Sequence, residues 1–287
     1  MNNKQVTHPM HQQSDIIDER GLMVFDNITS MPLYHEPYIT DRMTVTLNLN
    51  GWMKGECDMR PIHFRKHDIA IIPSRHILSA YKTSDDYHAI LIVLSPAFQE
   101  EMKHRYPDVY RDLQHYHYRQ DIPLNDRQFQ QTLYIIHLLR DLSMDDSPHR
   151  TVILGDLLEV LFLKMQDYRK ENGIDKHLPS LREELFSNFY DAIEEHYSES
   201  REVQFYANLF HLSPKYFSSV IKHQTGISAL AWINKYTTIQ AKNMLRRNKD
   251  TTIQQIASQL GFSDQAAFCR YFKQHTGVTP SDYRTMA

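Results

Sequence analysis

Two short segments of the sequence carry side chains that can hydrogen-bond to the edges of nucleic-acid bases. One set of polar residues surrounds Phe217, and the other surrounds Phe268. An arginine can donate two hydrogen bonds to guanine, and a glutamine can pair with adenine in the same two-point way. We therefore predict that six residues face base edges: Lys215, Ser218, Ser219, Gln265, Cys269 and Arg270. For Cys269 the predicted contact is an apolar one with a thymine methyl group.

A second set of basic residues suits contacts with phosphates, which fix the register of a protein on DNA without reading its sequence. We predict this role for Lys222, Lys242, Arg246 and Lys273. The charge of the chain is distributed accordingly. From Arg201 onward there are 11 Lys and Arg against 4 Asp and Glu, a net of +7, so the preceding residues carry −10 of the total −3. Positive charge concentrated in one part of a chain is typical of a nucleic-acid interface.

A pattern that occurs twice positions these side chains. It runs from Ala207 to Gly226 and again from Ala257 to Gly277, with a shift of 50 residues at the alanines and 51 at the glycines. Because the two shifts differ by one, the second copy has one extra residue, which we place after the serines of the pattern. Each copy predicts a helix, a turn and a second helix that begins at Ser213 or Ser263 and ends at a glycine, which is the layout of a helix-turn-helix.

The segment between the copies predicts one uninterrupted helix. Residues 229–247 contain no Gly or Pro and place apolar residues at helical spacing. A helix of this length spans about 28 Å. Successive major-groove faces of DNA lie about 34 Å apart, so such a connector suits two reading helices in neighbouring grooves.

Residues from about 181 to 284 resemble the DNA-binding domain of AraC/XylS-type bacterial transcription regulators. The closing run, Ile256–Arg284, is close to the family signature. The resemblance implies a sequence-specific regulator that binds double-stranded DNA, is not an enzyme, and contacts RNA polymerase if it activates. Two residues depart from the family pattern: His211 replaces a turn glycine, and Thr237 replaces an arginine on the connecting helix.

The front part of the chain predicts several short strands. Residues 44–50 alternate apolar and polar side chains, and the runs 68–73 and 87–94 are apolar enough for strands buried on both faces. Such strands suggest a small barrel or sandwich. The run Arg65–Pro73 followed by His76 resembles the cupin-like sensor domains of these regulators, although His67 replaces a glycine. The resemblance implies a small-molecule effector, whose contact residues the sequence does not identify.

Enzymes of the cupin type hold a metal with a clustered His-x-His and a carboxylate. Here the histidines of the strand region are scattered: His63, His67, His76 and His88. We therefore expect no metal, no cofactor and no catalytic residues. Two alternatives remain open: a metal-dependent cupin isomerase or dioxygenase with an appended helical domain, and an architectural DNA protein without sequence preference.

The expected fold is of the α+β class with two domains. An N-terminal cupin-like β-barrel with a helical hairpin precedes an all-α domain in which a long helix joins two helix-turn-helix units. The expected segments are a loose tail (1–20), the sensor domain (21–125), the hairpin (126–170), a linker (171–180) and the DNA-binding domain (181–287). The hairpin carries more apolar surface than one core needs, which fits either a cover over the barrel or a protein contact. The family resemblance, in which such helices often make the dimer contact, implies a homodimer.

The sequence also bears on location. It has no apolar run long enough to span a bilayer, and its first residues lack the apolar core of a signal peptide. The two cysteines, Cys57 and Cys269, are too few for a disulfide framework. We expect a cytoplasmic protein without a membrane partner.

Overall fold

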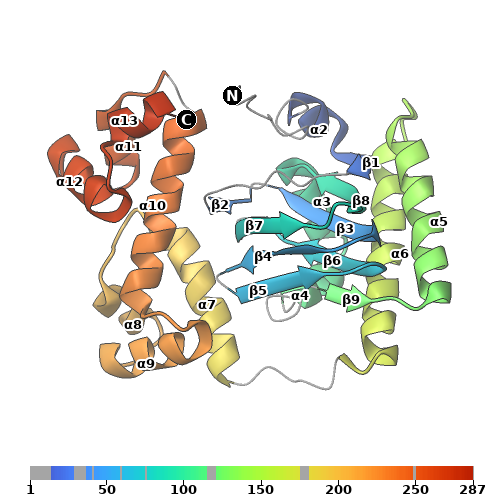
Figure 1. The fold of residues 1–287 in the computed structure, drawn as a ribbon, viewed down its shortest axis with the longest axis horizontal. Coiled ribbons are helices and arrows are strands. Elements are labelled where there is room, and N and C mark those ends of the chain that lie inside the picture. The colour runs from blue at the N-terminus through green and yellow to red at the C-terminus, as the bar shows by residue number, and fades with distance from the viewer. Residues whose placement is uncertain are drawn as a thin grey trace. The chain divides into compact units, whose positions relative to one another are not determined.

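The computed structural model describes residues 14–28, 37–40, 42–58, 60–74, 76–114, 121–174, 181–247 and 250–286. It consists of two compact units, Met1–His177 and Leu178–Ala287 (Figure 1). The first contains strands and helices, and the second contains only helices among its described residues. This confirms the predicted two-part α+β fold.

The strands of the first unit form two antiparallel sheets. The order in the larger sheet is β1-β8-β3-β6-β9, and in the smaller sheet it is β2-β7-β4-β5. The larger sheet contains β1 (Leu22–Ile28), β3 (Met43–Asn50), β6 (Asp68–Ile72), β8 (His88–Leu94) and β9 (Asp121–Pro123). The smaller sheet contains β2 (Tyr38–Ile39), β4 (Met53–Cys57), β5 (Arg60–Phe64) and β7 (Ile77–Thr83).

Alternation along β3 divides the first unit into layers. Val45 and Leu47 belong to a core that the larger sheet shares with helices α3, α5 and α6. Because side chains alternate along a strand, Thr46 and Asn48 face the opposite way, toward the core between the two sheets. The predicted alternation of residues 44–50 is confirmed, as are buried strands at β6 and β8.

Among the described residues, five helices accompany the sheets: α2 (Ser14–Arg20), α3 (Pro96–Arg105), α4 (Pro107–Gln114), α5 (Asp126–Ser143) and α6 (Arg150–Glu171). Helices α5 and α6 pack side by side as the expected hairpin (Figure 1). Asn125 and Gln128 form a reciprocal cap at the start of α5. Residues 14–20 differ from the expected loose tail, because Ile17 is fully buried and holds α2 against the sheets.

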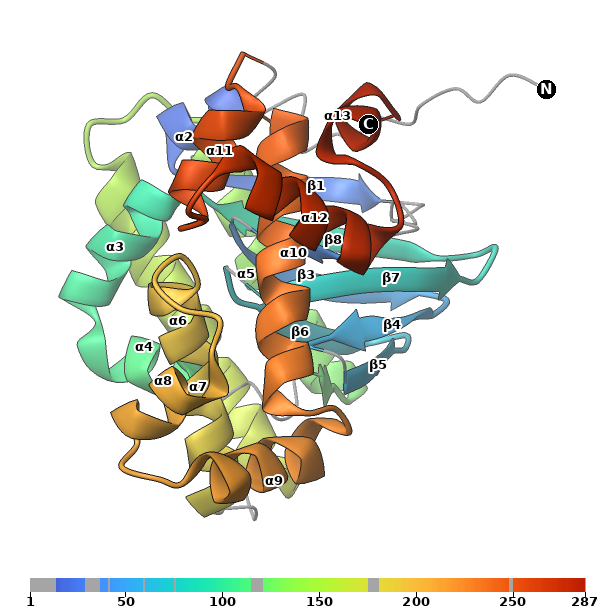
Figure 2. The same cartoon turned by 90° about the vertical axis from the view of Figure 1, so that its left-hand side faces the viewer.

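The second unit contains seven helices within its described residues. They are α7 (Leu181–His196), α8 (Val203–Leu209), α9 (Pro214–Thr225), α10 (Ala229–Arg247), α11 (Ile253–Gln259), α12 (Gln265–Thr276) and α13 (Pro280–Met286). The connecting helix α10 has the predicted ends. It runs between α8–α9 at one end and α11–α13 at the other (Figure 2).

Aromatic side chains build the core around α10. On the first half of the unit, Phe189 of α7 meets both Tyr206 of α8 and Phe217 of α9 edge to face. On the second half, Phe268 and Phe272 of α12 pack with Leu245 of α10 and Tyr283 of α13. Each half therefore has its own apolar centre, and α10 contributes to both.

Candidate nucleic-acid interface

The turns of the two repeated units have the same backbone geometry. The amide of Leu212 donates to the carbonyl of Ala207 over 2.9 Å, and that of Phe262 donates to Ala257 over the same distance. Between these residues the chain takes a positive φ, 55° at His211 and 69° at Gly261. The first unit therefore makes the turn with a histidine in the left-handed conformation, which a non-glycine residue adopts less readily. The departure at His211 leaves the helix-turn-helix intact.

The second helices of the two units also end alike. Gly226 and Gly277 take positive φ values and donate their amides to the carbonyls of Lys222 and Lys273, each over 2.8 Å. The preceding threonines, Thr225 and Thr276, bond back to the helix and forward to the next residues. The repeat thus specifies the C-terminal end of the second helix of each unit, as the glycines predict. These second helices, α9 and α12, are called the recognition helices below.

The N-terminal caps differ, and one prediction is wrong. Ser213 caps α9 as predicted, accepting from the amide of Tyr216. The cap of α12 is Asp264 rather than Ser263, because its carboxylate accepts from the amide of Ala267 over 2.7 Å. The one-residue slip between the units therefore lies at Ser263 itself, not after it. The Ala267 amide is the main cause that lowers the pKa of Asp264.

Each recognition helix buries one face and exposes the other. Helix α9 buries Phe217 and Ile221, and its opposite face exposes Lys215, Ser219 and Lys222, spaced four and three residues apart. With a shift of 51 residues, the corresponding exposed row of α12 is Ala266, Arg270 and Lys273. Residues at this spacing share one side of a helix. Helix α9 therefore presents three of the predicted base-reading or phosphate-binding residues on one exposed side, and α12 presents two.

The other predicted contacts lie beside these rows. Ser218 and Cys269 are half-buried on the flanks of α9 and α12, whereas Gln265 is exposed at the start of α12. Lys242 and Arg246 project from α10, with their cationic groups 5.2 and 5.3 Å from the ring centre of Tyr283. The exposed Tyr216 and Ala266 were missed, because helical periodicity alone does not show which polar-face positions a turn leaves accessible.

Comparison with known proteins supports this geometry. A helix-turn-helix domain family matches residues 206–286, which include both units and α10. The chain therefore carries a helix-turn-helix domain at these residues. It is 38% identical over 147 residues to the regulatory protein PocR of Salmonella typhimurium, covering 47% of this chain and 48% of PocR. It is 29% identical over 131 residues to the arabinose operon regulatory protein of Escherichia coli, covering 45% and 44%. The chain matches about half the length of these curated relatives.

One solved structure aligns with most of this chain, including residues of the first unit. ToxT from Vibrio cholerae has 14% identity and a TM-score of 0.45, covering 93% of this chain and 98% of ToxT. Within the described residues, none of the helices is long and apolar enough to cross a membrane.

The first unit contains a buried polar group between its sheets. Thr46, Asn48 and Tyr87 are each 2% exposed or less. Within the described structure, both amide atoms of Asn48 have no hydrogen-bond partner. The Thr46 and Tyr87 hydroxyls interact with each other but have no partner in good geometry. Burial raises the pKa of Tyr87 to about 12, against a smaller opposing effect of Thr46. Unpaired buried polar atoms are costly, so this group suits a bound polar molecule or ordered water.

One cluster of metal-type donors lies in the described part of the first unit. The donor atoms of Cys57, Asp58 and His76 lie within 4.8 Å of one another, and all three residues are buried. Asp58 takes φ 51° and is bonded to the His76 ring, and its other oxygen accepts from the amide of Ile77 over 3.0 Å. These buried hydrogen bonds join the end of β4 to the start of β7, which gives the cluster a structural role.

The remaining histidines of the strand region do not join that cluster. His67 takes φ 67°, the conformation expected of a residue in a glycine position, and stacks on Phe129 with ring centres 4.0 Å apart. His63 meets Trp52 edge to face. The described structure therefore offers no convergent set of histidines of the kind that the cupin-enzyme alternative requires.

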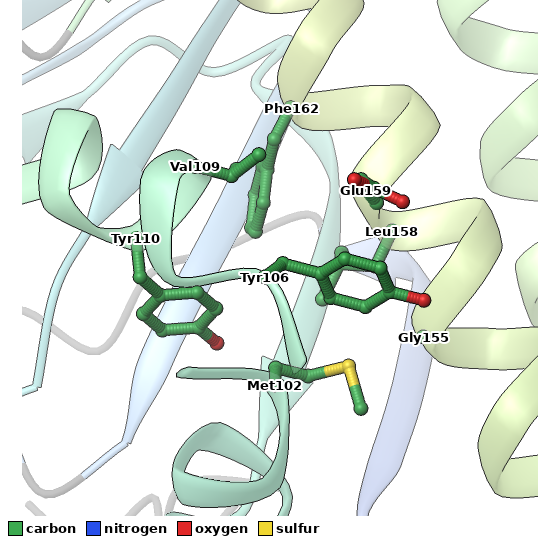
Figure 3. Close-up of a pocket in the computed structure, with 8 residues that line it drawn as sticks. All are labelled: Met102, Tyr106, Val109, Tyr110, Gly155, Leu158, Glu159 and Phe162. Carbon is green, nitrogen blue, oxygen red and sulfur yellow. The ribbon is translucent and has the colours of Figure 1, made fainter. Parts of the chain in front are cut away.

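A small apolar hollow lies between α3–α4 and α6 (Figure 3). Met102 and Tyr106 project toward α6 near Gly155, and the Tyr106 hydroxyl is bonded to Asp156. Tyr110 contributes a buried hydroxyl without a partner in the described structure, and burial raises its pKa. The hollow has fewer buried polar atoms without a partner than the core between the sheets.

Proposed function

We propose that this protein is a sequence-specific transcription regulator that reads promoter DNA with helices α9 and α12. The observation that supports this most is the exposed row on each recognition helix, repeated with a shift of 51 residues. In the proposal Lys215, Ser218 and Ser219 read one block of bases, and Gln265, Cys269 and Arg270 read a second. Lys222, Lys242, Arg246 and Lys273 hold phosphates.

The length of α10 supports simultaneous reading of both blocks. Its 19 residues span about 28 Å, close to the roughly 34 Å between successive major-groove faces. One chain can therefore engage two adjacent grooves on one side of the DNA. Such a role places the protein in the bacterial cytoplasm with the chromosome, and an activator would also contact RNA polymerase.

We further propose that the first unit, as a cupin-like sensor, binds a small effector between its two sheets. The buried side chains of Thr46, Asn48 and Tyr87 offer two hydroxyls and one amide, and no charged group is among them. The neighbouring Ala70 and Ala89 are small residues on the paired strands. A neutral molecule with hydrogen-bonding groups fits this lining better than an ion does.

A homodimer through the hairpin is the proposed assembly. Exposed apolar side chains lie along both of its helices: Tyr134, Leu138, Val152, Ile153, Val160 and Leu163. Several exposed apolar side chains on one helical hairpin favour a contact with another protein surface. Sedimentation of the Val160→Glu and Leu163→Glu variants tests this assignment, which predicts monomers for both. Unchanged dimers in both variants would contradict it.

Selection of bound fragments from a random DNA pool with the full chain tests the DNA-reading role. The proposal predicts enrichment of a two-block motif whose blocks lie about one helical turn apart, roughly 10–10.5 base pairs. A chain that folds but enriches no sequence would contradict it. Retention of every duplex alike would instead favour an architectural protein.

A further inference from the structure

The second helix-turn-helix is braced by a segment that precedes the first. After α7 the chain turns at Glu199 and Ser200, whose amides both donate to the His196 carbonyl. Arg201 then donates to the carbonyls of Leu260 and Gly261, over 2.8 and 3.1 Å, at the turn between α11 and α12. Its guanidinium also lies 4.0 Å from the ring centre of Phe262.

The same segment explains why the two turns carry different residues. A Cβ atom placed on Gly261 would lie 1.7 Å from the Ser198 carbonyl oxygen. His211, at the equivalent turn of the first unit, has an exposed side chain at nearly the same φ. The second turn therefore requires a glycine both for its φ and for the backbone that lies against it.

The brace continues on one side into α8 of the first helix-turn-helix and on the other side into α12 of the second. On one side, the buried Tyr206 of α8 donates its hydroxyl to the Ser200 carbonyl over 3.0 Å. On the other, Phe262 packs on Phe268 and Tyr271 of α12. The Tyr271 hydroxyl in turn lies 3.1 Å from the Asn234 carbonyl of α10. Contacts thus run from α8 through residues 198–201 to α12 without passing along α10.

We infer that Arg201 is a positioning residue that sets the relative placement of the two recognition helices, and hence the base-pair spacing the protein accepts. The guanidinium suits this role, because its rigid planar fork bonds two carbonyls in a fixed geometry while its face stacks on an aromatic ring, whereas an ammonium group has no plane to stack. This inference rests on the proposed two-block reading of DNA.

Binding to the selected DNA site, and to the same site with one base pair inserted between its blocks, tests the inference in the full chain. We expect at least tenfold weaker binding of the altered site by the wild type, and less than threefold by Arg201→Met. Arg201→Lys should restore the discrimination only in part. Arg284→Met is the matched control, because Arg284 donates to the Thr251 carbonyl within the second unit over 2.7 Å and should leave the discrimination unchanged.

An Arg201→Met protein that still discriminates tenfold would overturn the inference while leaving the DNA-reading function intact. Failure of the wild type to select any site would instead remove the proposed function. The brace is then tested without DNA, by the distance distribution between spin labels at His223→Cys and Gln274→Cys in a Cys269→Ser background. Both labelled positions are exposed. Arg201→Met should broaden a distribution that Arg284→Met leaves narrow, and equal widths would refute the brace.

Discussion

The two left-handed glycines of the second recognition unit provide a matched pair of substitutions. Gly261 and Gly277 have φ values of 69° and 83°. An alanine at either position meets left-handed strain of about 1–2 kcal/mol. The loss of chain entropy in the unfolded state offsets that strain by about 0.4–1 kcal/mol. Gly277 has nothing within 4 Å of an added Cβ, so Gly277→Ala should cost about 1 kcal/mol in all.

Gly261→Ala has a larger expected effect, because the Ser198 backbone must move away. That movement breaks the two hydrogen bonds of Arg201, at about 1.5–3 kcal/mol each for a charged donor, and its stacking on Phe262, at about 0.5–1 kcal/mol. Partial relaxation leaves a net difference of at least about 3 kcal/mol between the two variants. In a domain of this size, that difference corresponds to roughly 10 °C or more in Tm.

Tryptophan fluorescence can follow this difference in the full chain. The sequence has two tryptophans, Trp52 in the first unit and the fully buried Trp232 in α10. In a Trp52→Phe background, thermal unfolding reported by Trp232 is specific to the second unit. Midpoints of Gly261→Ala and Gly277→Ala that agree within 3 °C would refute the reasoning about the Ser198 contact.

Three further predictions concern DNA reading, the sensor interior and a helix cap. Arg270→Ala should weaken binding to the selected site by about 1–3 kcal/mol and relax preference at one base pair, whereas Lys222→Ala should weaken all sequences alike and reduce the salt dependence, as titrations at several salt concentrations would show. Asn48→Leu should stabilise the first unit against denaturant by about 1 kcal/mol, because it removes two buried amide atoms that lack partners. Tyr110→Phe, in the hollow of Figure 3, serves as the comparison variant. A destabilised Asn48→Leu protein would indicate that the amide is hydrogen-bonded. The Ala267 amide lowers the pKa of Asp264 in the folded protein. The cap therefore contributes stability above the ordinary pKa of 3.8, and this stability is lost as the pH falls through the lower pKa of the folded state. Asp264→Asn should abolish this acid dependence, which an NMR titration of the Ala267 amide would show.

Local patterns of the sequence were sufficient for much of the second unit. The ends of α10 follow from a run without Gly or Pro, and the αL glycines at 226 and 277 end the recognition helices as predicted. The N-cap at Ser263 was wrong because both Ser263 and Asp264 can cap a helix, and the letters alone do not locate a one-residue slip.

Other features depend on contacts that periodicity does not reveal. Strands β4 and β5 were not predicted, because Gly55 and Pro61 interrupt their apolar alternation. The Arg201 brace joins residues about 60 positions apart, and the Thr46–Asn48–Tyr87 group is assembled from two strand regions. No motif spacing marks either of them, so both required the folded structure.

We propose that α9 and α12 each read one of two blocks of DNA about a turn apart, and the proposed function depends on this two-helix reading. Repeating the random-pool selection with Ser219→Ala and with Arg270→Ala tests it most directly. We predict that Ser219→Ala alters base preference in one block only and Arg270→Ala in the other only, with the spacing preserved. If both substitutions change the same positions, or neither changes any, the two-helix reading of DNA is contradicted.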